Sequence, residues 1–184
     1  MKKYLLSLLV VLMVAGLAAG EITIKGGFTF TDVDLESSGD SFSAKYKMGF
    51  ALGLGFEWLM GDTVSFAPEI LYVQKNSTID EFEDWDYELG VFEFPLIFKF
   101  HLTDSFRLYG GPSFSYIMTA KADGDDVDDD TKNFDYGLVA GAQFVISETI
   151  GIEARYNWGF ADISEWEDAE VKTRSIYAFL SFTF

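Results

Sequence analysis

The sequence predicts an all-β protein, an eight-stranded antiparallel up-and-down transmembrane β-barrel preceded by a cleavable signal peptide. Three observations predict it. The N-terminus has the composition of a secretory signal, apolar residues alternate with polar ones along most of the remaining chain, and the connections between these segments alternate between short and long. Together they indicate a two-faced sheet in an exported protein.

The first twenty residues have the three parts of a signal peptide. Lys2 and Lys3 form its positive start, an uncharged apolar stretch follows, and Ala18-Ala19-Gly20 supplies small residues for cleavage. An uncleaved membrane anchor is the alternative, but the apolar stretch is too short to span a bilayer comfortably. The sequence therefore predicts a signal peptide at 1–20 and an outer-membrane β-barrel domain at 21–184.

Composition narrows the function classes. Loss of the two signal lysines takes the formal net charge from −17 to −19, which argues against a nucleic-acid partner. The chain has no cysteine, so neither a disulfide nor a lipid-modified cysteine is available. Aromatic residues make up 17% of the chain, yet nothing after residue 20 offers the ~20 consecutive apolar residues of a spanning helix. Strands must therefore carry the apolar side chains.

From residue 21 onward, apolar side chains recur at every second position in eight blocks, which is the period of a strand with two different faces. The even-numbered positions carry no charge, and one block reads Tyr46, Met48, Phe50, Leu52, Leu54, Phe56 and Trp58. The blocks cover residues 22–30, 46–58, 64–72, 92–100, 106–118, 136–146, 150–160 and 176–184. We expect one strand from each block.

Many odd-numbered positions of these blocks are Gly, Ala, Ser or Thr, and others carry a mixed set of charges. The charged members are Lys25, Lys47, Glu57, Glu69, Glu93, Lys99, Arg107, Glu153 and Arg155. Eight strands enclose too little room for a layer of aromatic side chains from every strand, so the charged face must point inward and the aromatic face outward. Such a band aggregates in water but is the expected belt in lipid. A lipocalin-like barrel with the apolar face inside is the alternative.

The connections alternate in length as those of a membrane barrel do. Short turns are expected at residues 59–62, 102–105 and 147–149, and long loops at 31–43, 75–88, 119–134 and 162–172. The sequence thus predicts a protein of the bacterial outer membrane with both termini in the periplasm. Pro68, Pro95 and Pro112 fall inside strands, where each removes a ladder hydrogen bond, so we expect bulges or bends there.

Several strand motifs lie in the second half of the chain: Phe94-Pro95-Leu96-Ile97-Phe98-Lys99, Leu108-Tyr109-Gly110-Gly111-Pro112, Tyr136-Gly137 with Gly141, and Glu153-Ala154-Arg155-Tyr156-Asn157-Trp158-Gly159. In these motifs the chain resembles the PorT-like family of small outer-membrane β-barrel proteins. The terminal Phe182-Thr183-Phe184 is similar to the aromatic end by which many such barrels are recognised, so the resemblance implies the barrel assembly machinery as a partner of Phe184. It implies no activity, because the namesake's role in protein secretion does not follow from strand motifs.

The lone histidine argues against an enzyme. Some small outer-membrane barrels modify lipid A with a histidine that acts beside a serine and an acidic residue near the outer leaflet. His101 falls at the inner end of its strand, and we expect no serine and acidic pair around it. No phosphate-binding loop and no His or Cys metal spacing occurs either. We therefore expect a non-enzymatic protein without a cofactor.

The long loops are strongly acidic, most of all the run from Asp123 to Asp130. Carboxylates are ligands for calcium and magnesium, but the run lacks the spacing of an EF-hand, and such runs are more often solvated loops. We expect at most weak divalent cation binding, which would bridge the loops to lipopolysaccharide headgroups. Outer-membrane lipid is the other expected partner, and a protein partner is not identified by the sequence.

The five cations and four anions assigned to the lumen nearly balance. Because a charge in a narrow lumen needs a partner, we predict an interior network that plugs the barrel. Lys99 and Arg107 should pair with Glu57 or Glu153, and Arg155 with Glu69 or Glu93. The leading function is a structural or interaction protein, and a narrow gated pore or a lipid-modifying enzyme is the alternative.

Overall fold

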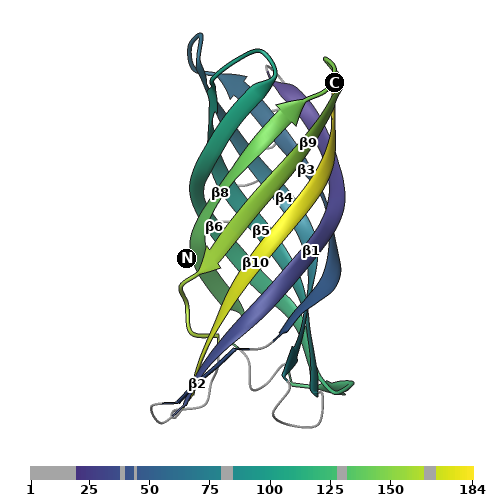
Figure 1. Ribbon diagram of the computed structural model, residues 1–184, viewed down its shortest axis with the longest axis vertical. Coiled ribbons are helices and arrows are strands. Elements are labelled where there is room, and N and C mark those ends of the chain that lie inside the picture. Colours follow the sequence, from purple (N-terminus) through teal and green to yellow (C-terminus); the bar gives the residue numbers. More distant parts are fainter. Residues whose placement is uncertain (1–19, 38–39, 44, 80–84, 128–131, 164–168) are drawn as a thin grey trace.

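The computed structural model describes residues 20–37, 40–43, 45–79, 85–127, 132–163 and 169–184. Residues 1–19 of the predicted signal peptide lie outside them. The described residues form a closed barrel of antiparallel strands (Figure 1). No helix in this part of the chain is long and apolar enough to cross a membrane.

Eight long strands form the wall of the barrel, one from each block of alternating residues. They are β1 (Glu21–Ser37), β3 (Lys45–Leu59), β4 (Val64–Ile79), β5 (Trp85–His101), β6 (Phe106–Ala122), β8 (Phe134–Val145), β9 (Ile150–Gly159) and β10 (Ala169–Thr183). Two short strands, β2 (Asp40–Ser43) and β7 (Asp125–Asp126), extend the wall at one end. Each long strand pairs with its neighbours along the chain, and β10 pairs with β1 to close the sheet. Closure removes the open edges that a bilayer does not tolerate, and the predicted barrel is confirmed.

The stagger of the strands follows from the pairing register. Starting at Trp58 on β3 and stepping from partner to partner, one circuit of the barrel passes through Phe66, Phe98, Gly110, Ala140, Tyr156, Ile176 and Phe30. The circuit returns to β3 at Met48, so the shear is ten residues, the separation between Trp58 and Met48. With eight strands, this stagger goes with a tilt of about 35–45° to the barrel axis and an interior that side chains alone can fill.

The two faces of the wall differ as the alternation predicts. On β5, Glu93, Ile97 and Lys99 point inward and are buried, whereas Phe98 and Phe100 are 40% and 49% exposed. The same alternation recurs along the other strands of the wall, with odd positions inside and even positions outside. The aromatic face is therefore the outer surface, which excludes the lipocalin-like alternative.

We expected bulges or bends at the prolines; they interrupt the pairing but do not shift its register, so no bulge occurs there. Pro68, Pro95 and Pro112 each have a paired residue on a neighbouring strand, and the register is the same on both sides of each proline. A proline gives up one N–H of the ladder, and the pairing is interrupted where Glu69–Ile70 lies opposite Phe94–Pro95 and where Leu96–Ile97 lies opposite Gly111–Pro112. The register shifts instead after Lys47 on β3 and after Gly90 on β5.

The strands run further than we expected at the long-loop end. Residues 31–37, 75–79, 85–88, 119–122 and 169–172 were expected in loops and are strand. They form two groups of paired strands, β10 with β1 and β2, and β4 with β5, β6 and β7, at the lower end in Figure 1. Positive φ at Asp123 (51°) and Gly124 (87°) makes the tight turn between β6 and β7. The outward positions of these extensions, such as Asn76 and Thr78, are polar, so the extensions lack the apolar alternation that marks the wall, although Lys75 between them and the wall is buried.

The opposite end of the barrel carries the three short turns. Residues 60–63, 102–105 and 146–149 connect the strands there, within one residue of the expected positions. Backbone hydrogen bonds close them, from Met60 N to Val64 O (2.9 Å), Leu102 N to Phe106 O (3.1 Å) and Ile146 N to Ile150 O (2.9 Å). Ile22 and Phe184 exchange backbone hydrogen bonds of 3.2 and 2.9 Å at this same end. The first and last strands of the wall thus start and finish beside the short turns.

Leu52, at the middle of β3 on the outer face, tests the lipid-facing belt. Leu52→Arg should lower the free energy of unfolding in lipid vesicles by about 2–4 kcal/mol, because the guanidinium must sit at the depth of the hydrocarbon. Tyr46→Arg, near the long-loop end of the same face, should cost only about 0–1 kcal/mol. Denaturant titration of the refolded barrels gives both values, and equal costs would contradict the belt.

Candidate functional site

The lumen contains the charged residues in layers along the barrel, and the central layer is the most deeply buried. Lys25 of β1 donates from Nζ to Glu69 Oε1 on β4 (2.6 Å) and to Glu153 Oε1 on β9 (2.9 Å). Arg155, also on β9, donates from Nη2 to Glu69 Oε2 at 2.8 Å. All four side chains are at most 1% exposed. Two cations and two carboxylates from three strands thus form a neutral group in the middle of the barrel.

Two aromatic side chains complete the central layer. The Tyr109 hydroxyl donates to Glu153 Oε2 (3.2 Å) and accepts from Arg155 Nε (3.3 Å). The Arg155 guanidinium lies 5.3 and 5.2 Å from the ring centroids of Tyr109 and Phe179, contacts that stabilise a cation removed from water. Gly141 leaves room for this arrangement, since a Cβ there would lie 2.5 Å from the Tyr109 ring. The layer is therefore packed as well as paired.

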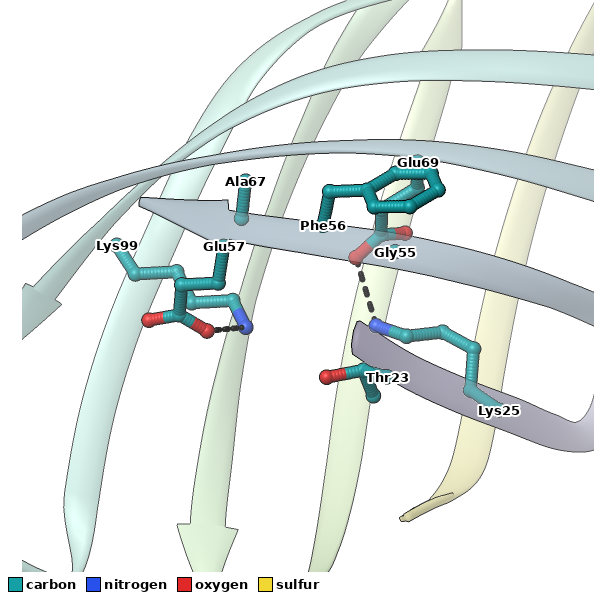
Figure 2. Close-up of a pocket in the computed structure, with 8 residues that line it drawn as sticks. All are labelled: Thr23, Lys25, Gly55, Phe56, Glu57, Ala67, Glu69 and Lys99. Atoms are coloured by element: carbon teal, nitrogen blue, oxygen red, sulfur yellow. Dashed lines mark hydrogen bonds and ion pairs between the residues drawn. The ribbon is translucent and has the colours of Figure 1, made fainter. Parts of the chain in front are cut away.

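Figure 2 shows the recess between the central layer and the layer nearer the short turns. Its lining residues are Thr23, Lys25, Gly55, Phe56, Glu57, Ala67, Glu69 and Lys99. In this view Lys25 and Lys99 point to separate carboxylates, those of Glu69 and Glu57. The recess has no room for a sphere of the size of a water molecule, so it offers no passage for water.

The layer near the short turns is centred on Glu57 of β3. Lys99 Nζ donates to Oε2 at 2.7 Å, and the Ser65 hydroxyl donates to Oε1 at 2.5 Å. His101 Nε2 lies 3.3 Å and Arg107 Nη1 3.6 Å from Oε1. One carboxylate therefore faces two permanent cations and a histidine. Lys99 and Arg107 both lie at Glu57, one of the two carboxylates at which we expected them.

His101 has a serine and an acidic neighbour, which corrects our expectation that it would have neither. Ser65 Oγ and Glu57 Oε1 lie 3.0 and 3.3 Å from the same ring nitrogen, Nε2. The expectation was wrong because both neighbours come from other strands, which the sheet brings beside β5. The three do not form a catalytic triad, since serine and carboxylate share one histidine nitrogen and the hydroxyl proton goes directly to Glu57. Ser65 is also fully buried, where no substrate can reach it.

A third layer, toward the long loops, contains residues that the sequence analysis missed. Lys75 Nζ lies 2.8 Å from Glu93 Oε1, which also accepts from the Tyr177 hydroxyl (2.9 Å) and from Asn157 Nδ2 (3.3 Å). Asp135, also buried, accepts hydrogen bonds from a threonine hydroxyl and a backbone N–H. Lys75 was missed because its segment was expected to be a loop. The tyrosine and asparagine occupy odd positions of predicted strands, so their inward direction could have been expected.

The remaining predicted residues take other positions. Arg155 lies at Glu69, one of its two expected partners. Lys47 lies on β3 opposite Thr31 of β1 and Asn76 of β4, where the β3 register shifts. Nowhere in the described residues do three or more His, Cys, Asp or Glu side chains come together as a metal site requires. Residues 128–130 of the acidic run lie outside the described part of the chain.

Apolar side chains fill the lumen toward the long loops. Leu89, Val91, Ile117, Ala120 and Ile163 are buried and pack against one another. Ile163 comes from the segment after β9, and backbone hydrogen bonds hold it in place, from the Lys132 N–H to its carbonyl (2.8 Å) and from its own N–H to the Val171 carbonyl (2.9 Å). This apolar cluster lies in the barrel on the long-loop side of the charged layers.

The central layer makes a thermodynamic prediction. Glu153→Gln should lower the free energy of unfolding by about 3–5 kcal/mol, because it leaves buried cations short of a counter-charge. The double variant Lys25→Met/Glu153→Gln removes one cation and one anion, so it should cost less than the sum of the two single changes. Denaturant titrations in vesicles measure all three values. Strictly additive losses would contradict a coupled network.

Comparisons with known proteins agree with this architecture. Among solved structures, Neisserial surface protein A (NspA) superposes with a TM-score of 0.64 at 14% identity, over 89% of this chain and 97% of that chain. Ail, the attachment invasion locus protein of Yersinia pestis, gives 0.54 at 18% identity over 90% and 99% of the two chains. OprG of Pseudomonas aeruginosa gives 0.52 at 13% identity over 90% and 96%. At these identities the likeness concerns the fold alone.

A search of curated protein sequences found no match. Residues 19–165, most of the chain, match the family described as "Outer membrane protein beta-barrel domain". The closed eight-stranded wall and its apolar outer face are what such a domain requires. This protein therefore belongs to the outer membrane β-barrel domain family, and it is a protein of the bacterial outer membrane.

Proposed function

We propose that this protein is a closed, non-enzymatic barrel of the outer membrane that acts by binding partners at its long-loop end. The observation that carries the proposal is the closed lumen. The neutral group of Lys25, Arg155, Glu69 and Glu153 occupies its middle, and the apolar cluster around Ile163 lies beyond it. In a barrel without a passage through the lumen, only the two ends and the outer face are available to bind partners.

The pairing of the lumen charges argues against a pore. Conduction needs a continuous path in which ions bind strongly enough to enter and weakly enough to leave. In the central layer the closest contacts between cations and carboxylates are 2.6–2.9 Å, and the side chains are almost completely buried. A passing ion would have to break these pairs, and the aromatic rings of Tyr109 and Phe179 fill the space beside them.

The chemistry of the lumen supports a non-enzymatic role. The one histidine shares its nitrogen between Ser65 and Glu57, and the serine is inaccessible. The strand motifs that resemble PorT-like barrels belong to the wall, and wall motifs define a fold without defining a reaction. The name of the structural neighbour Ail describes attachment, and that of NspA a surface protein, which is the kind of role proposed here.

The charge of the long-loop end suggests its partner. The four segments expected as loops contain 21 of the 30 acidic residues and only four lysines. We place this end outside the cell and the short turns in the periplasm, as is usual for such barrels. So acidic a surface repels the anionic headgroups of lipopolysaccharide unless divalent cations lie between them. Lipopolysaccharide bridged by magnesium or calcium is therefore the proposed partner.

Planar bilayers test the closed lumen. The wild-type barrel should add no conductance above that of the bare membrane, because its charged groups are paired across the lumen. A variant in which Lys25, Glu69, Glu153 and Arg155 are all replaced by serine is the positive control, since it removes the central layer. Its folding is checked by heat-modifiable gel mobility before the recording. Steady wild-type conductance that rises with salt would contradict the closed lumen and favour the pore.

Divalent cations test the proposed partner. Millimolar magnesium should raise the unfolding temperature in vesicles that contain lipopolysaccharide and protect residues 120–134 from proteolysis, because it bridges carboxylates and phosphates. The triple variant with asparagine at Asp123, Asp125 and Asp126 should lose part of the effect. Vesicles of zwitterionic phospholipid provide the matched control. If sodium at the same ionic strength reproduced the whole effect, screening alone would explain it and bridging would be excluded.

A further inference from the structure

We propose that the short-turn end of the lumen is a binding site for a single oxyanion group, a phosphate or a carboxylate, held by Arg107 with His101 beside it. The site is separate from the acidic loops at the other end, and it does not depend on the role proposed for them. Its basis is a surplus of positive charge, a buried donor without an acceptor, and access from one side only.

The surplus follows from the pairing in each layer. The central layer contains as many cations as carboxylates and is neutral in itself. Near the short turns, Lys99 and Arg107 share Glu57, the one buried carboxylate that contacts them in the described part of the chain, whereas Glu21, its register partner, is exposed to solvent. Cations withdrawn from water need an opposite charge nearby.

Glu57 forms an ion pair with Arg107 but gives it no hydrogen bond. Its Oε2 accepts from Lys99 at 2.7 Å, and its Oε1 accepts from the Ser65 hydroxyl at 2.5 Å. Arg107 Nη1 stays 3.6 Å from Oε1, beyond hydrogen-bonding distance. The closest contacts of the carboxylate are therefore made with other residues.

The Arg107 guanidinium also presents an unused donor. Its Nε is buried and has no hydrogen-bond acceptor among the described residues. An unmet buried donor is costly, and a charged one more so. If the guanidinium turns so that Nε faces the opening, it can donate two parallel bonds to one carboxylate or phosphate, which would satisfy Nε and neutralise the positive charge together. The donor set therefore favours an oxyanion over chloride.

The site is open at the short-turn end and closed behind. The side chains of Arg107 and His101 are 21% and 18% exposed, whereas Lys99 is only 3% exposed. Deeper in the barrel, the recess behind Lys99 cannot hold a water molecule. Glu21, the register partner of Glu57, is exposed to solvent, so water weakens its repulsion of an incoming anion. An anion can thus reach Arg107 from the turn side and go no further.

Calorimetric titration of the refolded barrel in zwitterionic detergent tests the site. Inorganic phosphate and acetate should bind with one-to-one stoichiometry, and chloride at matched ionic strength should not. Arg107→Gln should weaken phosphate binding at least tenfold, because it removes both the positive charge and the two parallel N–H donors of the guanidinium. Arg107→Lys keeps the positive charge but not the paired donors, so its affinity for phosphate should lie between those of the wild type and Arg107→Gln. Lys132→Gln, which removes an exposed cation at the opposite end, is the matched control and should bind as wild type does.

A lipid arm of the experiment distinguishes the source of the anion. If the natural ligand is a lipid headgroup, vesicles with phosphatidylglycerol should reduce phosphate binding relative to vesicles of phosphatidylcholine. If it is a soluble anion, the two vesicles should give the same affinity. Both results agree with an oxyanion site. A folded wild-type barrel that binds phosphate no better than chloride, or an Arg107→Gln variant that binds phosphate as tightly as wild type, would overturn the proposal.

Discussion

The interior of an eight-stranded barrel has no bulk water, so each charge inside must find its counter-charge inside as well. Much of the structure follows from this constraint. Lys25 reaches carboxylates on two other strands because no solvent can take their place. Arg155 adds aromatic faces to its ion pair, and Gly141 is small so that the Tyr109 ring can lie where those faces are needed. The outer face, bathed in lipid, has only to be apolar, which is why its residues vary freely in size.

A structural feature could be predicted from the sequence when the residues that determine it lie close together along the chain. The number of strands, the closure of the barrel and the direction of each face follow from the alternation of apolar with small or polar residues. This alternation can be read within a single block of about ten residues, such as the block from Tyr46 to Trp58. The strand extensions do not show it, because their outward positions, such as Asn76 and Thr78, are polar, and for that reason Lys75 was assigned to a loop. The placement of Lys99 and Arg107 beside Glu57 is nearly local, since the first two flank one short turn.

The central layer could not be predicted in detail. Which residues of β1, β4 and β9 meet across the lumen depends on the shear of ten, and the shear depends on the register of every pair of strands at once. One shift, such as that after Gly90, changes which inward residues are level with each other. His101 illustrates the point, because Ser65 and Glu57 reach it from β4 and β3. The prolines predict bulges by a local rule, but the register continues unchanged past each of them, because the paired residues on both sides fix it.

The pairing of β10 with β1 has a consequence for the order of assembly. The two strands are the last and the first of the wall, and they pair from Thr23 with Thr183 to Ser37 with Ala169. Lys25 lies on the first strand and Glu153 on the last but one, so the central layer is incomplete in any nascent chain that lacks the C-terminal quarter. An open, half-finished sheet would carry unneutralised lysine and arginine side chains beside bare backbone edges, both of which hydrocarbon rejects. Closure of the seam between β10 and β1 therefore removes the last open backbone edges, and it requires the pairing of residues far apart in the sequence.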